Sequence, residues 1–334
     1  MRCRADKNRV TNAHSLDGRP VRPLLKWAGG KRQLLPVLRR YYPTGFERYI
    51  EPFFGSGAVY FDLLASGRLA GRQAWILDGN PDLVGCYLAL RDHTEAVIEE
   101  LAVLERHHRA GGTSFYYEVR DRRFNPRRAA APGVYAPDLA AMLIYLNRTG
   151  FNGLFRLNRS GGYNVPAGRY ENPTICDAAH LRGVAAALSA RTVRIDGGSF
   201  ERPLESAGPG DFVYCDPPYA PLGPTARFAQ YTAAGFGEPD QQRLQHAVLG
   251  AVRRGAIVVL SNSSTPFIEA LYGGHEARRA GLVMRRVPAR RAINSRAALR
   301  GPVNEVLVTN LAISNLPGRA RPLKASLRQS VRTA

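Results

Sequence analysis

The chain has 334 residues, of which 45% are hydrophobic, and no apolar run approaches the ~20 residues that a membrane-spanning helix needs. Lysine and arginine total 47 against 27 for aspartate and glutamate, a formal net charge of +20. This composition excludes a membrane-spanning or wholly disordered chain, and the charge favours a polyanionic partner such as nucleic acid.

The four cysteines lie far apart and the histidines are scattered, without the spacing of metal ligands. We therefore expect no disulfide framework and no metal, and we predict a reducing, cytoplasmic compartment. Residues 1–22 are polar and basic and predict a flexible leader, whereas residues 313–334 predict a basic tail.

Order is expected to begin at Pro23, and Gly29-Gly30-Lys31 then opens a helix-like run over residues 34–41. The free N–H groups of a helix start, together with the Lys31 charge, make a candidate anion or carboxylate site. The alternative is a plain turn into a helix, and the frame of a P-loop is missing.

The segment Tyr49 to Val59 predicts a strand, a glycine turn and a helix. Gly55 and Gly57 would let the backbone approach a ligand closely. A second strand, Ala74 to Asp78, ends in an acid that can accept hydrogen bonds from ribose hydroxyls. A third glycine is absent, which argues against a dinucleotide and a hydride-transfer enzyme.

From about residue 85 to 191 the pattern is mainly helical, with runs at 83–109, 114–124 and 137–147. The stretch from 147 to 170 breaks this period, and Gly161-Gly162 centres a predicted β-hairpin. Its arginines, asparagines and aromatics suit a ribbon that lies in a DNA groove, although a solvated glycine-rich loop is the alternative.

Strands are predicted again at 192–196, 211–215 and 256–260, with a helix at 240–253 that completes a second βαβ unit. The strand at 211–215 leads directly into Asp216-Pro217-Pro218-Tyr219. The two prolines fix φ and hold Asp216 and Tyr219 at the carboxyl end of the strand, where ligands bind in open α/β sheets. Residues 285–300 carry six arginines and no acid, which predicts a phosphate-contacting loop before a closing strand at 303–311.

An adenosine site without a pyrophosphate anchor favours S-adenosylmethionine, and the basic insert favours DNA. The chemistry that combines them is methylation of an exocyclic amine on a base. Asp216 and a backbone carbonyl of the proline turn can accept its N–H bonds, while Tyr219 stacks on a base flipped from the duplex.

The sequence resembles the Dam-like, alpha-ordered DNA adenine-N6 methyltransferases, the D12 class, over residues 23–312. The matching blocks are Lys26-Trp27-Ala28-Gly29-Gly30-Lys31, Glu51-Pro52-Phe53-Phe54-Gly55-Ser56-Gly57, Asp78-Gly79-Asn80-Pro81-Asp82, Leu146 to Tyr170, Asp216-Pro217-Pro218-Tyr219 and Gly301-Pro302-Val303-Asn304-Glu305-Val306-Leu307.

The resemblance implies an α/β fold: a Rossmann-like, S-adenosylmethionine-dependent methyltransferase sheet of seven mixed strands, with an inserted helical recognition domain that carries the hairpin. It assigns 23–84 and 192–312 to the catalytic domain and 85–191 to the insert. It also implies double-stranded DNA as partner, a monomer in solution, a cytoplasmic protein of bacterial or phage origin, and a cognate restriction endonuclease as a candidate partner.

By the same resemblance, Asp216, Pro217, Pro218 and Tyr219 form the catalytic turn. The residues implied to bind the methyl donor are Trp27, Lys31, Phe53, Gly55, Gly57, Asp78 and Asp216. Arg156 is implied to read a guanine, possible sites being GATC or a relative of it, and Phe151 stands where relatives often have Tyr. The further residues expected to contact DNA are Arg148, Asn152, Leu154, Arg169 and Tyr170. Two alternatives remain: an amine methyltransferase that acts on RNA or protein, and an inactive homologue that only binds DNA.

Overall fold

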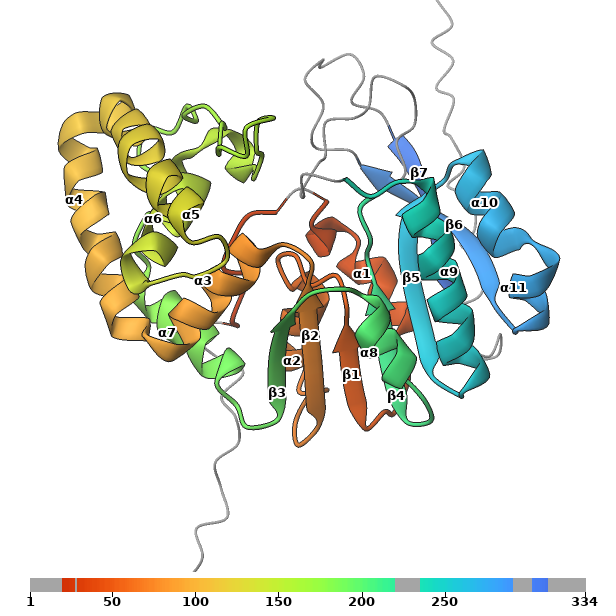
Figure 1. The fold of residues 1–334 in the computed structure, drawn as a ribbon. Helices are drawn as coiled ribbons and strands as arrows, with labels where there is room; N and C mark the ends of the chain where they lie inside the picture. The colour runs from red at the N-terminus through yellow and green to blue at the C-terminus, as the bar shows by residue number, and fades with distance from the viewer. Residues whose placement is uncertain (1–19, 28, 220–234, 291–301, 312–334) are drawn as a thin grey trace, which may run out of the picture.

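A computed structural model describes residues 20–27, 29–219, 235–290 and 302–311 (Figure 1). Seven strands form one sheet in the order β3-β2-β1-β4-β5-β7-β6. The first five positions are parallel, and β7 runs antiparallel to both β5 and β6. The strands are β1 (Arg48–Glu51), β2 (Gln73–Asp78), β3 (Val193–Gly197), β4 (Asp211–Cys215), β5 (Ile257–Ser263), β6 (Val283–Arg290) and β7 (Pro302–Thr309). The mixed α/β sheet and the strands predicted within it are confirmed.

The sheet is covered on both faces because successive residues of each strand point to opposite sides. In β4, Phe212 and Tyr214 belong to one hydrophobic cluster, whereas Val213 and Cys215 belong to the other. All five β4 residues are buried, which explains the continuous apolar run of this strand.

Figure 1 shows α8 and α9 in front of the sheet, with α10 and α11 beyond its β5 side. Helix α2 lies behind it. The bounds are α2 (Ala58–Ala65), α8 (Glu201–Ser206), α9 (Glu238–Arg253), α10 (Pro266–Gly273) and α11 (His275–Arg279). The unit β4–α9–β5 is the predicted second βαβ half.

The run predicted as one helix over 34–41 is two short pieces, α1 (Leu35–Leu38) and η2 (Arg39–Tyr41), and a third short piece, η1 (Lys31–Gln33), precedes them. Pro36 is the cause, because it has no N–H and its ring excludes the carbonyl one turn earlier. Order also begins before Pro23, since Val21 is packed in the core.

The helices between β2 and β3 are α3 (Pro81–Asp92), α4 (Thr94–Glu118), the π-helical η3 (Val119–Phe124), α5 (Asn125–Ala130), α6 (Pro137–Thr149), η4 (Phe151–Gly153) and α7 (Ala178–Leu188). Figure 1 shows α4, α5 and α6 beside the β3 edge of the sheet. The run expected at 83–109 is divided at His93, and α4 is kinked at Gly112. Helix α3 passes through the boundary predicted at residue 85 and contacts both β2 and β3.

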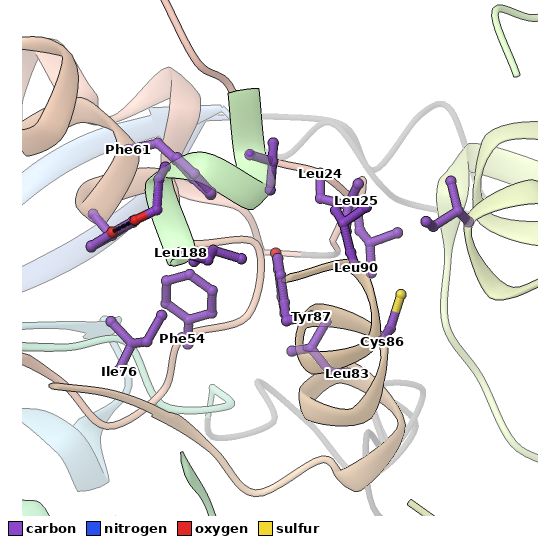
Figure 2. Close-up of a cluster of buried hydrophobic side chains, with 14 of the residues drawn as sticks. Leu24, Leu25, Phe54, Phe61, Ile76, Leu83, Cys86, Tyr87, Leu90 and Leu188 are labelled. Carbon is purple, nitrogen blue, oxygen red and sulfur yellow. Dashed lines mark hydrogen bonds between the residues drawn. The ribbon is translucent and has the colours of Figure 1, made fainter. Parts of the chain in front are cut away.

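Phe54 anchors the turn after β1 in the core between the sheet and α3. Figure 2 shows its ring among Ile76, Leu83 and Tyr87, and its centroid lies 5.1 Å from that of Tyr87. This packing fixes the start of the glycine turn against the ends of two strands.

The prediction of a loop over 285–300 is wrong for its first part, because Arg285, Arg286 and Arg290 lie in β6. Val287 is buried whereas Arg286 and Pro288, on the opposite face, are exposed, so this strand has one wet face. The rest of that stretch, the basic leader up to residue 19 and the tail from 312 lie outside the described residues. None of the helices in the described ranges is long and apolar enough to cross a membrane.

Candidate active site

Three functional loops leave the carboxyl ends of three adjacent parallel strands, β2, β1 and β4. The chain order reverses between β1 and β4, since β2 and β3 lie on one side of β1 and β4 and β5 on the other. Open α/β sheets bind ligands at this switch point. The structure thus brings Asp78, the glycine turn and Asp216 to one edge, as the sequence predicted.

Gly55 and Gly57 are required in this turn both by their backbone conformation and by the side chains packed against them. Gly57 has φ +68°, and a Cβ there would lie 2.4 Å from Cζ of Phe54. Gly55 has φ +50°, and its Cβ would lie 3.1 Å from Cδ1 of Trp27. A left-handed φ and a neighbouring ring exclude side chains at both positions.

Asp78 holds this turn onto the end of β2. Its Oδ2 accepts the Gly55 N–H at 2.8 Å, and its Oδ1 accepts the Asn80 N–H at 2.8 Å. Burial raises the pKa of Asp78 to about 6, against the effect of the two N–H donors. Each carboxylate oxygen can accept a further bond, so the acid retains capacity for hydroxyl donors.

A hollow of about 180 Å³, which includes space open to solvent, lies beside Asp78 and is lined also by Phe54, Val84 and Asp196. Ligand pockets for drug-sized molecules measure about 300–1,000 Å³. This hollow is smaller than such a pocket and has no enclosed room for a bound group in this structure.

Phe53 forms an aromatic wall with two residues that the sequence did not single out. Its ring is stacked on Phe200, with centroids 5.3 Å apart, and meets Phe236 edge-on at 5.7 Å. Phe200 directly precedes α8, after the end of β3. An aromatic just beyond a predicted strand end was the available signal.

Asp216 is held by two donors that both contact the same oxygen. Lys31 Nζ lies 2.8 Å from Oδ1, and Ser261 Oγ donates to Oδ1 at 3.0 Å. Oδ2 accepts no hydrogen bond from the described part of the chain. Burial raises the pKa of Asp216 and the Lys31 charge opposes this. One carboxylate oxygen is thus fixed while the other can accept from a ligand.

Lys31 is a buried cation that organises the turn after β4. Its side chain is 5% exposed, and its ammonium donates to the Gly29 carbonyl at 2.8 Å. The same nitrogen lies 4.5 Å from the centroid of the Tyr219 ring. The predicted anion site is therefore filled from within the chain, by the Asp216 carboxylate.

The remaining residues of the turn are fixed by other elements. Tyr219 donates its hydroxyl to Oε2 of Glu305, on β7, at 2.7 Å. The Pro218 carbonyl accepts from Nε2 of Gln241, on α9, at 2.9 Å. Lys31 covers one face of the Tyr219 ring.

Trp27 joins this edge of the sheet to the insert. Its ring stacks on Phe155 with a centroid separation of 5.5 Å and an interplanar angle of 26°. Next to it, the Lys26 N–H donates to Oδ1 of Asn147 at 2.9 Å, and Nδ2 of Asn147 donates to the carbonyls of Lys26 and Gly153. Asn147 is the first residue of the segment 147–170. Nothing in the sequence indicated that its side chain connects this segment to Lys26.

The predicted hairpin has antiparallel arms without regular strands. Isolated bridges pair Gly150 with Ala167 and Leu157 with Tyr163. The Asn158 side chain closes the turn by accepting the Gly162 N–H at 2.8 Å. The Tyr163 N–H donates to Oδ1 of Asn125 at 2.8 Å, which ties this arm to the start of α5.

The residues predicted to contact DNA are not equivalent. Phe151, Asn152, Arg169 and Tyr170 are exposed, and Leu154 is half-buried. Asn152 has φ 54°, a left-handed conformation that turns the chain at the tip of η4.

The two remaining arginines of this set are held by the protein. Arg156 donates from Nε to Oδ1 of Asn164 at 2.7 Å and from Nη2 to its carbonyl at 3.1 Å. Arg148 donates to the carbonyls of Leu24 and Thr174, and burial lowers its pKa. Arg156 is thus oriented with donors to spare, whereas the contacts of Arg148 join the N-terminal segment to the insert.

No group of three or more His, Cys, Asp or Glu residues is placed to hold a metal ion within the described ranges. The site as described rests on carboxylates, a lysine, aromatic rings and backbone groups.

Comparison with known proteins identifies the family. The sequence model for D12 class N6 adenine-specific DNA methyltransferases matches residues 27–283. The chain is 36% identical over 290 residues to the type II methyltransferase M1.LlaDCHI of Lactococcus lactis subsp. cremoris, covering 87% of this chain and 95% of that protein. It is 34% identical over 289 residues to the DNA adenine methylase of Escherichia coli K12, covering 86% of this chain and 94% of that protein.

A second DNA adenine methylase, from Vibrio cholerae, is 34% identical over 290 residues, covering 86% of this chain and 95% of the relative. The matched region contains the glycine turn, Asp78, the insert and the turn after β4. With the acid, the glycine turn and the Asp-Pro-Pro-Tyr turn meeting at one sheet edge, this chain belongs to the D12 class of N6 adenine-specific DNA methyltransferases.

Proposed function

We propose that this protein transfers the methyl group of S-adenosylmethionine to the N6 amine of an adenine in duplex DNA, within GATC or a related site. The observation that carries the proposal is Asp216 at the end of β4, with Oδ1 held by Lys31 and Ser261 and with Oδ2 able to accept. This carboxylate lies at the sheet edge where the glycine turn and Asp78 meet.

Several features fit S-adenosylmethionine as the methyl donor. Asp78 would accept from ribose hydroxyls, because both of its oxygens retain acceptor capacity. Phe53, Gly55 and Gly57 line the turn beside it, and Trp27 packs against Gly55. Lys31, whose ammonium lies beside Asp216, would also contact the donor. When bound, S-adenosylmethionine supplies an electrophilic methyl group.

The residues of the turn would prepare the target amine. An exocyclic amine is a weak nucleophile, because its lone pair is delocalised into the ring. Asp216 and the carbonyl of Pro217 would accept its two N–H bonds, which favours a tetrahedral nitrogen with a localised lone pair. Pro217 and Pro218 restrict the backbone, and Tyr219 would stack on the base after it leaves the duplex.

The insert would select the site. Arg156 is pre-oriented by Asn164, and we assign it to a guanine edge. Phe151 would wedge or stack, and Asn152, Leu154, Arg169 and Tyr170 would contact the duplex around it. Arg148 would contribute from its position at the base of the block. The net charge of +20 supports strong phosphate attraction.

We further propose that the protein is encoded by a bacterium or a phage and acts as a monomer in the cytoplasm, associated with the nucleoid. A cognate restriction endonuclease is the proposed genetic partner, because one relative carries the name of a type II methyltransferase. Reading methylated motifs in host DNA with and without the gene would identify the site.

The central test measures methyl transfer from labelled S-adenosylmethionine to duplex DNA and to RNA of the same sequence. We expect label on N6 of adenine in DNA, and we expect Asp216→Ala and the isosteric Asp216→Asn to lose it while retaining DNA affinity. Asp92→Asn, at the exposed end of α3, is the control. Transfer to RNA alone, or DNA binding without transfer, would replace the proposal by one of its two alternatives.

A further inference from the structure

Gln241 is a polar residue in the core, on the first turn of α9. Its side chain is 0% exposed. A buried amide without partners is destabilising, so the bonds of Gln241 indicate which groups it holds in place.

The amide of Gln241 bridges β5 and the turn after β4. Nε2 donates to the Pro218 carbonyl at 2.9 Å, and Oε1 accepts from Nδ2 of Asn262 at 2.9 Å. Asn262 is also fully buried, and its Oδ1 accepts the Ser263 N–H at 2.8 Å.

This chain of bonds determines which end of each amide faces which partner. Because the Ser263 N–H can only donate, it takes the oxygen of Asn262 and leaves the nitrogen for Gln241. Gln241 must then present its oxygen to Asn262 and its nitrogen to Pro218. The donor that reaches the turn is therefore fixed in orientation by a backbone group of β5.

The hydrogen bond from Gln241 to Pro218 restricts a backbone angle that the proline rings do not fix. A proline ring fixes φ near −65°, so the shape of the segment Asp216 to Tyr219 depends mainly on ψ of Pro217 and Pro218. Holding the Pro218 carbonyl fixes the peptide plane between Pro218 and Tyr219, and with it ψ of Pro218. It thereby limits where the Tyr219 ring can lie relative to Asp216 and the Pro217 carbonyl.

We propose that Gln241 is a positioning residue for methyl transfer, which acts through the Pro218 carbonyl and is itself oriented by Asn262. This rests on the proposed function, because it assumes that the Pro217 carbonyl and Asp216 receive the target amine. A misplacement of about 1 Å in such a site can cost about 100-fold in rate.

The first test compares Gln241→Met, which removes the donor at similar length, with Gln242→Met, its exposed neighbour on α9. Single-turnover methylation is measured with the dissociation constants for DNA and S-adenosylmethionine and the thermal unfolding midpoint. We expect Gln241→Met to lose roughly 10- to 100-fold in rate with both affinities within about threefold of wild type. Gln242→Met should match wild type.

An unchanged rate in Gln241→Met would overturn the proposal, and so would a rate loss matched by equal losses in both affinities. A wild-type protein without any methyl transfer would instead contradict the proposed function. The two failures are therefore distinguishable.

Gln241→Glu gives an answer even if the methionine variant does not fold. It keeps the acceptor for Asn262 and donates to Pro218 only while it is protonated. Its rate divided by that of wild type should fall as the pH rises from 6 to 9. The neighbouring groups Lys31, Asp216, Tyr219 and Glu305 are common to both proteins, so the ratio isolates residue 241. A ratio that does not change with pH would refute the role.

Discussion

The Lys31 ammonium lies 2.8 Å from Oδ1 of Asp216, and the two side chains are 5% and 19% exposed. A buried carboxylate favours its neutral form, and the lysine charge works against that preference. Lys31 therefore favours the ionised form of Asp216, which can accept hydrogen bonds at both oxygens.

Lys31→Met should raise the pKa of Asp216 further and move the acid limb of the pH–rate profile to higher pH. Methylation activity at pH 7 should fall, because a protonated carboxyl group cannot accept both from Ser261 and from the target amine. The measurement is kcat/KM for duplex DNA between pH 5 and 9. Arg32→Met, an exposed cation in the same short helix, should leave the acid limb in place. An unmoved limb in Lys31→Met would show that Asp216 does not depend on this charge.

Asp78 should make donor binding depend on pH. Its pKa lies near 6, so it is a carboxylate above that pH and a weaker acceptor for ribose hydroxyls below it. The affinity for S-adenosylmethionine, measured by calorimetry between pH 5 and 8, should fall as the pH drops below about 6. Asp78→Asn should bind weakly with no such dependence. Parallel pH curves for the two proteins would contradict the assignment.

The same shift affects stability. Because the folded pKa of about 6 exceeds the ordinary 3.8, the contribution of Asp78 is fully present below 3.8 and is lost as the pH rises through about 6. The difference in unfolding free energy between wild type and Asp78→Asn should therefore change within that window and be constant above it.

Gly57 and Gly67 separate backbone strain from steric overlap. Both have a left-handed φ, but a Cβ would lie 2.4 Å from the Phe54 ring at Gly57 and would meet nothing within 4 Å at Gly67. Gly67→Ala should lose about 1 kcal/mol of unfolding free energy from strain alone. Gly57→Ala should lose clearly more in urea denaturation, and it should also lose donor affinity. Equal losses would mean that Phe54 moves aside without cost.

Arg156 and Arg159 separate base reading from charge. Arg156 is oriented by Asn164, whereas Arg159 is exposed at the turn. Arg156→Ala should lose about 1–3 kcal/mol of discrimination at one base pair, measured as kcat/KM on the preferred duplex against singly substituted duplexes. Arg159→Ala should weaken binding to all duplexes alike and reduce the salt dependence. An unchanged preference in Arg156→Ala would remove this residue from base reading.

The sequence by itself determined which loops form the candidate site, because its signals are local. A buried strand that runs into Asp216-Pro217-Pro218-Tyr219, a glycine turn after another strand, and an acid at the end of a third each depend on neighbours in the chain. Parallel strands then place all three loops at one edge. The motifs shared with the D12 class occur in the same order along the chain, which identified these three loops as parts of one site.

Other features depend on residues far apart in the chain, and only the tertiary structure decided them. Lys31 was predicted as an anion site, but its partner is Asp216, 185 positions later, and no local pattern links them. Arg148 and Arg156 both lie in the segment 147–170, but they have different partners. Arg148 donates to the Leu24 carbonyl, whereas Arg156 donates to the Asn164 side chain. No sequence pattern marks Gln241, because a polar residue in a helix is expected to be exposed. Its burial depends on the elements that pack around it. Local periodicity and turn chemistry are written in the sequence, whereas the partner of a buried polar group is set by how distant elements pack.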